Sequence, residues 1–578
     1  MAAAEPPFLD ASTAMLAVHD GPDWTRVAPP RDGCTVTPLI EAADMYPTLE
    51  HLVLDAQSSV WLSFRIFNPE TRTRSQRCRE LGIADWASLL EHAVHRGVTV
   101  RILLTDFEPV LADYLHAASW STFASIRGIV ERLDAPDRER LQLMVVQHEG
   151  EIGWGWRQLI RLLLRRRIRE VVETLLEKER HDDGGFDTRP GLWRHIEWGE
   201  KKPRAWKPAP PPRLWPATYH QKFVVVDGEH AIIGGLDLDE RRWDDRRHQR
   251  RADRTWHDIS ALIEGPVVAD AAEHFRRLWD REIPRYRDTV EEWTGECGRE
   301  LMLDPLSEIA DEPSPPSHGA GEAKVQLVRT LSRKSDRLFA VGPLKGVREV
   351  KAAHRELIRA ARKQLYIEAQ FFRSEAAARW VEEALRANRD LEVIILIANT
   401  PEEVAFEKQT KNLAHRHGEH LQTRALSRLL RRAGRDRVGL FTLAKRETVK
   451  PGEAQFEESR GTAYGSGLIH IHAKLVIADD SHCLLSSANI NGRSFEWDTE
   501  LGVIWSERRA VATFKRRLWG QLFGGSMPEG GNLEGWRELA RFNAMAEPEE
   551  RKGFVVPYQL GRARRFGRPY WFIPDDLV

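Results

Sequence analysis

Two short motifs with the same spacing of histidine, lysine and aspartate stand far apart in this chain. The first reads His220-Gln221-Lys222 and, after four more residues, Asp227. The second reads His472-Ala473-Lys474 and, after four more residues, Asp479. One such motif in 578 residues could arise by chance. Two motifs in matching frames indicate that one structural unit is used twice.

The duplication extends well beyond the two motifs. After each motif aspartate, six more residues lead to a pair of small residues, Gly234-Gly235 in the first copy and Ser486-Ser487 in the second. Each motif opens an apolar run that predicts a buried strand, and a second apolar run follows. A third predicted strand carries an acid, Asp258 in one copy and Glu500 in the other. Each copy then continues into an amphipathic helix with a Phe-(Lys)-Arg-Arg-Leu-Trp sequence.

Strand and helix patterns also alternate upstream of each motif. The predicted strands are 59–64, 98–104, 365–367 and 391–397, and the predicted helices are 86–96, 350–362 and 376–387. This alternation predicts an α/β fold in which helices cover a mixed sheet. We expect two similar α/β halves, related by a pseudo-twofold axis, with one active site at their interface.

The domain organisation follows from these copies and from local composition. We expect an N-terminal extension over 1–34 and a first half over 35–301, with a basic, tryptophan-rich insertion at about 150–218. A stretch rich in Pro, Ser, Gly and acids, 302–323, predicts the linker. The second half and a C-terminal segment occupy 324–578.

Composition narrows the class of protein. Apolar content of 42% and charged content of 30% are ordinary for a globular protein with two large cores. The chain contains no run of about 18 apolar residues, so no membrane span is expected. The N-terminus lacks a basic region followed by an apolar core. The four cysteines have no metal-ligand spacing. We therefore expect no metal and no other cofactor, and a cytoplasmic or peripheral membrane location. Secretion without a conventional signal peptide stays open.

The motif residues suit the chemistry of a phosphodiester. One imidazole can attack phosphorus and form a phosphohistidine, while the other protonates the leaving oxygen and then deprotonates water or an alcohol. Lys222 and Lys474 can neutralise the non-bridging oxygens in the transition state. Residues two apart on a strand point the same way, so each H-x-K places both side chains on one face. Asp258 and Glu500 are candidates to accept the Nδ1–H of a motif histidine and fix its tautomer.

The double H-x-K-x₄-D pattern resembles the phospholipase D superfamily, and the segments around Gly235 and Asp258 resemble its eukaryote-type phospholipases D. The resemblance implies that His220 is the nucleophile and that His472 acts as general acid and then base. We include the motif aspartates Asp227 and Asp479 among the catalytic candidates, although in the family they are more often structural.

The resemblance also implies phosphate-binding positions. Asn489 is similar to the family asparagine that donates to phosphate, and the first half has Asp237 at the matching place. This departs from the two-asparagine pattern of bacterial cardiolipin synthases and endonucleases. The candidate substrate-binding residues are Asn489, Ser487, Gly235, Glu368 and Gln370.

The insertion contains a distinctive basic segment. Residues 154–180 predict one amphipathic helix with an apolar stripe, arginines crowded into its first half and tryptophans at its start. This pattern is typical of a helix that lies on a membrane surface, but the same stripe could pack on the domain. The Trp- and Pro-rich segment 193–215 then leads directly to His220, and we expect it to form a wall or lid of the active-site mouth.

The sequence therefore predicts a monomeric enzyme that hydrolyses glycerophospholipids at a membrane surface to phosphatidic acid and a head-group alcohol. Transphosphatidylation is expected through the same intermediate. The alternatives are a phosphatidyltransferase such as a cardiolipin synthase, a metal-independent nuclease or phosphodiesterase, and a non-catalytic lipid-binding protein. A net charge of −1 speaks against an obligatory nucleic-acid partner. The missing membrane span speaks against a cardiolipin synthase.

Overall fold

A computed structural model describes residues 7–15, 26–179, 185–199, 202–210, 213–294, 301, 303, 305–309, 319–406, 411–434, 436–449, 460–525, 527 and 531–578. Part of the predicted linker, together with Cys297, lies outside these residues. The described chain forms a mixed sheet with helices packed on it, so the predicted α/β class is confirmed.

The first half builds its sheet in the order β4, β3, β2, β7, β8, β10, β1. The strands β4 (Leu141–Val146), β3 (Thr99–Thr105) and β2 (Ser59–Phe64) are parallel. Each later strand runs antiparallel to its neighbour; these are β7 (Phe223–Val226), β8 (His230–Gly234), β10 (Ile259–Glu264) and β1 (Arg31–Ile40).

The second half repeats this order and these directions. Its parallel strands are β15 (Val438–Thr448), β14 (Glu392–Ile397) and β13 (Gln364–Ala369). Its antiparallel strands are β19 (Leu475–Ala478), β20 (His482–Ser486), β21 (Glu500–Ser506) and β11 (Ala323–Arg333). Strands β12 (Leu344–Arg348) and β22 (Val555–Pro557) are added at β11 and β15. The strand order is thus duplicated; the rotation axis stays a prediction.

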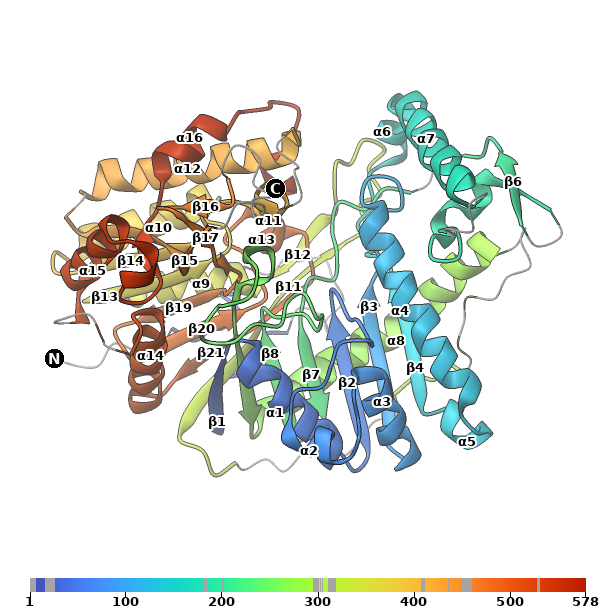
Figure 1. The fold of residues 1–578 in the computed structure, drawn as a ribbon, viewed down its shortest axis with the longest axis horizontal. Helices are drawn as coiled ribbons and strands as arrows, with labels where there is room; N and C mark the ends of the chain where they lie inside the picture. Colours follow the sequence, from blue (N-terminus) through green and yellow to red (C-terminus); the bar gives the residue numbers. More distant parts are fainter. Residues whose placement is uncertain are drawn as a thin grey trace.

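The two sheets join where β1 pairs with β11, so that the blue-to-green half and the yellow-to-red half lie side by side in Figure 1. The helices of the first half are α1 (Ala42–Asp55), α2 (Gln76–Glu80), α3 (Trp86–His95), α4 (Asp113–Arg132), α5 (Ala135–Arg138) and α8 (Val267–Thr294). Those of the second half are α9 (Glu349–Ala360), α10 (Glu375–Ala387), α11 (Glu402–Phe406), α12 (Leu413–Ala433), α13 (Gly492–Glu496), α14 (Arg508–Leu522), α15 (Leu533–Met545) and α16 (Leu560–Phe566).

The apolar runs that predicted strands are buried on both faces, because helices cover the sheets. All six residues of β2 and all four of β7 are buried. Helix starts follow capping chemistry: Asp85 accepts from Ser88 N before α3, and Ser374 accepts from Ala377 N before α10. The predicted upstream strands and helices are therefore confirmed, and each end lies within two residues of its predicted position.

The insertion differs from its prediction. Residues 154–180 form two helices, α6 (Trp154–Leu159) and α7 (Arg161–Glu179), because the chain leaves helical geometry at Ile160. The predicted apolar stripe of α7 packs inward, and Leu164, Ile168, Val172 and Leu175 are buried. The Trp- and Pro-rich segment that follows contains a two-stranded ribbon, β5 (Ile196–Trp198) with β6 (Pro203–Trp206). Within the described residues, no helix is long and apolar enough to cross a membrane.

Candidate active site

Backbone pairing brings each motif against the other half. The short strands β9 (Trp256–His257) and β18 (His470–Ile471) pair in parallel, and Tyr219 forms a matching parallel bridge with Thr499. The amides of His220 and Gln221 both donate to the Thr499 carbonyl, at 2.9 Å each. The His472 amide donates to the His257 carbonyl at 2.8 Å. Each motif histidine therefore lies beside the residue that precedes the acid of the other half.

The histidine–acid pairs are crossed between the halves. His220 Nδ1 lies 2.9 Å from Glu500 Oε1, and His472 Nδ1 lies 2.7 Å from Asp258 Oδ2. A carboxylate that accepts the Nδ1–H fixes the tautomer in which Nε2 has a free lone pair. Glu500 begins β21, whereas Asp258 lies between β9 and β10 rather than within a strand. The residues expected to orient the histidines are thus in contact with them.

Burial sets the charge of these pairs. Burial, reinforced by Lys222 and Arg65, holds the pKa of His220 well below its usual value. Burial, reinforced by Lys474 and Arg242, does the same to the pKa of His472. Both free imidazoles are therefore neutral near pH 7. Burial also raises the pKa of Glu500, and raises that of Asp258 to about 6.

The motif lysines sit in equivalent places. Lys222 Nζ donates to the His220 carbonyl at 2.5 Å, and Lys474 Nζ donates to the His472 carbonyl. Burial lowers the pKa of both lysines, and that of Lys474 falls to about 7. The positive charge of Lys474 contributes to the lowered pKa of His220, and Lys222 contributes to that of His472. The two motifs therefore share one electrostatic environment.

A third cation, Arg242, was missed by sequence reasoning. Its guanidinium is buried and lies 4.1 Å from the ring centroid of Trp256, whose ring also contacts His472. Within the described residues, its Nη1 has no hydrogen-bond partner. Arg242 follows the Gly234-Gly235 pair by a few residues, which was the available signal. An unpaired buried N–H beside two lysines suits an anionic oxygen.

Asp237 and Asn489 occupy equivalent positions after β8 and β20. Asp237 Oδ1 accepts from the Arg65 and Ile66 amides at 3.1 and 2.9 Å, and its Oδ2 lies 4.0 Å from Lys222 Nζ. Burial alone would raise the pKa of Asp237, but Lys222, Arg242 and Arg65 lower it. The Oδ1 of Asn489 is buried and has no hydrogen-bond partner within the described residues.

The small-residue pairs make room for the acids. A Cβ on Gly235 would lie 2.5 Å from Asp258 Oδ1, so any side chain there would displace the carboxylate. Ser487, at the matching place, instead donates from its hydroxyl to Glu500 Oε2 at 2.5 Å. Gly235 and Ser487, expected to bind substrate, thus contact the orienting acids.

The motif aspartates lie at the opposite end of the motif strands from the histidines. Asp227 accepts from the amides of residues 57–59 at 2.8 Å each, and Asp479 accepts from those of residues 362–364 at 2.6 to 2.9 Å. Both have φ of 52° and terminate the motif strand in a turn. Their contacts hold the start of β2 or β13, so these carboxylates serve the framework rather than the reacting groups.

Glu368 and Gln370 are turned toward other partners. Glu368 is fully buried, accepts from the Tyr366 hydroxyl and lies 2.8 Å from His257 Nε2. The other ring nitrogen of His257 lies 2.5 Å from Glu41 Oε1. Burial opposes protonation, but Glu41 and Glu368 raise the pKa of His257 well above its usual value. Gln370 Nε2 lies 3.3 Å from His470 Nε2. The Glu41–His257–Glu368 bridge had no motif spacing to reveal it.

Two groups of side chains within the described residues are close enough to hold a metal ion: Glu41 with His248 and His257, and His220 with Asp498 and Glu500. In both groups an imidazole already lies at hydrogen-bond distance from a carboxylate, 2.5 Å for His257 to Glu41 and 2.9 Å for His220 to Glu500. A metal in the second group would occupy the predicted nucleophile.

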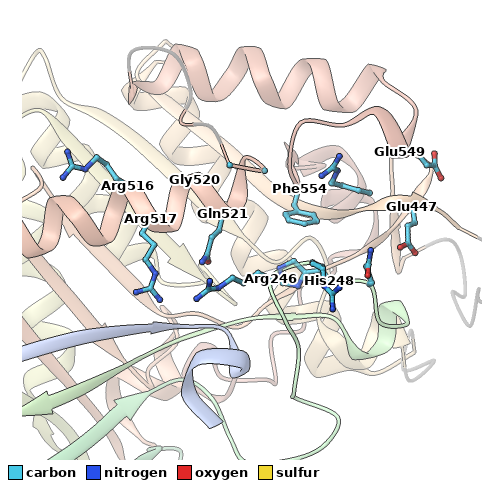
Figure 2. Close-up of a pocket in the computed structure, with 14 residues that line it drawn as sticks. Arg246, His248, Glu447, Arg516, Arg517, Gly520, Gln521, Glu549 and Phe554 are labelled. Carbon is cyan, nitrogen blue, oxygen red and sulfur yellow. The ribbon is translucent and has the colours of Figure 1, made fainter. Parts of the chain in front are cut away.

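A basic cavity of 790 Å³ lies elsewhere between the halves (Figure 2). Arginines from both halves line it, including Arg246 and Arg517. Both of these guanidiniums contact the Asp44 carboxylate, which offsets part of the positive charge. Its lining includes no residue of either motif, so it is distinct from the paired histidines.

The chain is similar to several known proteins. The family model described as "Cardiolipin synthase, PLD-like domain" matches residues 355–521. Phospholipase D alpha 1 of Oryza sativa subsp. japonica is 24% identical over 459 residues, which cover 62% of this chain and 53% of the relative. Phospholipase D1 of Saccharomyces cerevisiae is 24% identical over 370 residues, which cover 51% and 21%.

Among solved structures, the phosphatidylserine synthase of Haemophilus influenzae matches with a TM-score of 0.48 and 11% identity, over 88% of this chain and 93% of that one. The match with the rice enzyme takes in about half of that enzyme's length, and the match with the yeast enzyme about a fifth. The matched family model and the run of phospholipase D relatives together support membership of the phospholipase D superfamily.

Proposed function

We propose that the chain is a phospholipase D-type phosphodiesterase. It hydrolyses glycerophospholipids to phosphatidic acid and a head-group alcohol through a phosphohistidine intermediate. One observation carries the proposal: each motif histidine has its Nδ1 against a buried acid of the other half, at 2.9 and 2.7 Å. Two imidazoles with free Nε2 atoms beside two buried lysines are what a two-step displacement at phosphorus requires.

In the first step, the His220 Nε2 lone pair attacks phosphorus and the bond from phosphorus to the head-group oxygen breaks. His472, protonated on Nε2, gives its proton to that oxygen. Burial and neighbouring cations lower the pKa of His472 in the free site. A bound phosphodiester anion opposes those cations, so substrate binding favours the protonated form. Lys222, Lys474 and Arg242 stabilise the charge on the non-bridging oxygens.

In the second step, the now neutral His472 removes a proton from water, and the water oxygen attacks phosphorus. The phosphorus–nitrogen bond breaks, which returns His220 to its neutral form and releases phosphatidic acid. An alcohol can replace water at the same place, because the head-group alcohol has just left it. The product is then a phosphatidyl alcohol.

The proposal of a lipid substrate rests on the relatives, which are named as phospholipases D of a plant and of yeast. We also propose that the chain works as a monomer, either in the cytoplasm or as a peripheral membrane protein, with its two halves divided near residues 302–323. A second candidate is a phosphatidyltransferase, because the matched family model is described as a cardiolipin synthase domain. Both candidates share the first step and differ in the acceptor.

The test supplies phosphatidylcholine and phosphatidylethanolamine in parallel, with and without butanol, and measures products by mass spectrometry. We expect phosphatidic acid in water and phosphatidylbutanol with butanol, in a ratio that does not depend on the original head group, because both lipids pass through one intermediate. A ratio that follows the head group, or no phosphatidylbutanol at any tolerated concentration, would argue for direct attack by water. Phosphatidyl transfer to a lipid alcohol without phosphatidic acid would favour the second candidate.

A further inference from the structure

An exposed apolar surface stands at the start of the insertion. It comprises Trp154, Trp156, Leu159, Leu162 and Leu163 of α6–α7, with Leu338, Phe339 and Val341 of the connection between β11 and β12; we call it the tip patch. Leu162 and Leu163 are 73% and 71% exposed, and Phe339 is 55% exposed. Half of the sixteen exposed large apolar side chains of the described residues lie here. Such a concentration marks an interaction surface.

The two segments of the tip patch are joined to each other. The Gly153 and Gly155 amides donate to the Ala340 and Leu338 carbonyls at 2.7 Å each, and Trp156 Nε1 donates to the Phe339 carbonyl at 3.0 Å. A Cβ on Gly155 would lie 2.6 Å from the Phe339 ring, so the close approach requires glycine there. The tip patch is therefore one surface contributed by both halves.

The domain core does not need these side chains. The inward stripe of α7 is buried separately, with Leu164 and Ile168 only 4% and 1% exposed. Leu162 and Leu163 precede this stripe and point away from it. In Figure 1, α6 and α7 lie together at one outer corner of the molecule. Leaving large apolar side chains in water is unfavourable in proportion to their exposed apolar area, and a covering partner would remove that cost.

Positive charge surrounds the start of α7. Arg161, Arg166, Arg167 and Arg169 are exposed, and the first acid of this helix is Glu170. Arg166 and Arg167 approach Glu170 at 3.1 and 3.7 Å, but all three side chains are about half exposed or more, and such pairs are weak. Apolar side chains ringed by arginine complement an anionic lipid surface, which attracts basic residues.

Both segments of the tip patch continue to residues beside His220. On one segment, the His148 ring lies 5.2 Å from the ring of Tyr219, which precedes His220. On the other, Gly342 packs so closely on Trp497 that a Cβ would lie 2.8 Å from its ring. Trp497 precedes Asp498, whose carboxylate lies near His220. The chain beside each segment of the tip patch therefore contacts the residue that precedes His220 or the residue that precedes Asp498.

We propose that the tip patch docks the enzyme on an anionic phospholipid bilayer, with its apolar side chains at the boundary between head groups and acyl chains. The arginines at the start of α7 contact lipid phosphates. This places the His220 side of the active site toward the membrane. The inference rests on the proposed function for its purpose, but docking itself requires no turnover.

The experiment measures co-sedimentation of the full chain with vesicles of phosphatidylcholine alone or mixed with phosphatidylglycerol. The docking variant is Leu162→Asp with Leu163→Asp, and the matched control is Leu81→Asp, because Leu81 is 56% exposed at the end of α2, which lies far from α7 in Figure 1. We expect wild type and the control to bind mixed vesicles alike. The docking variant should bind at least ~10-fold more weakly, since its two substituted side chains would no longer bury apolar surface in the bilayer.

A second variant, Arg166→Gln with Arg167→Gln, should reduce binding to mixed vesicles while leaving the weaker binding to phosphatidylcholine unchanged. All variants should turn over a water-soluble monomeric phosphodiester as wild type does. Wild type that fails to bind mixed vesicles would overturn the proposal. So would equal binding of the docking variant, an equal loss in the Leu81→Asp control, or a dimer that the docking variant converts to monomer. Vesicle binding without lipid hydrolysis would instead overturn the proposed function and keep the docking surface.

Discussion

The two halves have the same strand order but differ in the charges that they bring to the shared site. In the first half, the Asp237 carboxylate lies 4.0 Å from Lys222 Nζ. In the second half, neutral Asn489 takes the equivalent position, and its Oδ1 has no hydrogen-bond partner within the described residues. The duplicated framework fixes where side chains stand, and single substitutions decide what charge each place carries.

A second difference lies beside the orienting acids. His257 precedes Asp258 and bridges Glu41 to Glu368, whereas Thr499 precedes Glu500. In the first half, Ser63 takes the position that Glu368 has in the second, and it accepts from the Gln221 side chain at 3.0 Å. A buried charged bridge therefore ties the halves together on the Asp258 side. The surroundings of His220 and His472 are therefore alike in geometry, but this charged bridge lies only beside the acid that contacts His472.

The largest expected effect comes from the histidines, and it tests whether their roles differ. His220→Ala should lower turnover by at least ~10⁴-fold, because the covalent step is lost. His472→Ala should cost about 10²–10⁴-fold, the usual worth of acid–base assistance. With a substrate that has a good leaving group, His472→Asn should still form an adduct on His220, mapped by mass spectrometry. An adduct on His472 in a His220→Asn variant would reverse the assignment.

The next effect tests the crossing of the acids. Glu500→Gln should impair His220, and Asp258→Asn should impair His472, each by about 10²–10⁴-fold in kcat/KM. A good leaving group needs no proton, so it should restore formation of the adduct in Asp258→Asn and not in Glu500→Gln. Equal rescue of both variants would break the crossed assignment.

The same acid predicts the pH profile of the free enzyme. Burial raises the pKa of Asp258 to about 6, so protonation below that pH removes the acceptor of the His472 Nδ1–H. We expect kcat/KM to fall as the pH drops through about 6, and the apparent pKa belongs to Asp258 together with the neighbouring Lys474, because the charge of each affects the pKa of the other. Steady-state kinetics from pH 5 to 8 should show this limb in wild type and not in Asp258→Asn.

A smaller effect is expected when the charge at position 237 or 489 is changed. Asp237→Asn should change kcat/KM by less than ~10-fold, because an amide oxygen can still accept from the Arg65 and Ile66 amides. Asn489→Asp should lower kcat/KM by about 100-fold, because a carboxylate within about 5 Å of the phosphodiester repels it by roughly 3 kcal/mol. Equal effects of the two variants would mean that the halves contribute alike.

The smallest expected effect is that of chelation. The proposed steps use imidazoles and lysines, so excess EDTA should change turnover of a soluble phosphodiester by less than ~2-fold. Added Zn²⁺ should inhibit instead, because His220, Asp498 and Glu500 are close enough to bind it. Loss of activity in EDTA that only a divalent ion restores would contradict the two-histidine mechanism.

Much of this architecture could be predicted because the duplication repeats local signals. Apolar runs predicted β2, β7 and β19, and matching frames pointed to both histidines, both lysines and both orienting acids. The crossing of the acids could not be predicted, because Glu500 lies 280 residues from His220 and no local pattern connects them. Arg242 and Glu41 were missed because no motif spacing connects them to Trp256 and His257, the residues that they contact.

Some interpretations needed side-chain partners to decide them. Asp227 and Asp479 belong to the motif but serve the backbone, since residues 57–59 and 362–364 donate to them. The basic helix was open between a membrane surface and the core. Its stripe packs inward, as the core interpretation expects, while Leu162 and Leu163 stay exposed, so a membrane contact stays a proposal for those residues. Hydrophobic periodicity identifies the apolar face of a helix, but it does not show how much of that helix the neighbouring elements bury.

The crossed backbone hydrogen bonds, from the His220 amide to Thr499 and from the His472 amide to His257, have a consequence for biosynthesis. During synthesis, the N-terminal half emerges from the ribosome before residue 472 is made. At that stage His220 has no acid to orient it. Catalytic power therefore arises only when the nascent chain has completed and assembled both portions. Separately expressed fragments divided near residue 320 should each be inert and should regain turnover on mixing, so that recovered activity counts correctly assembled molecules.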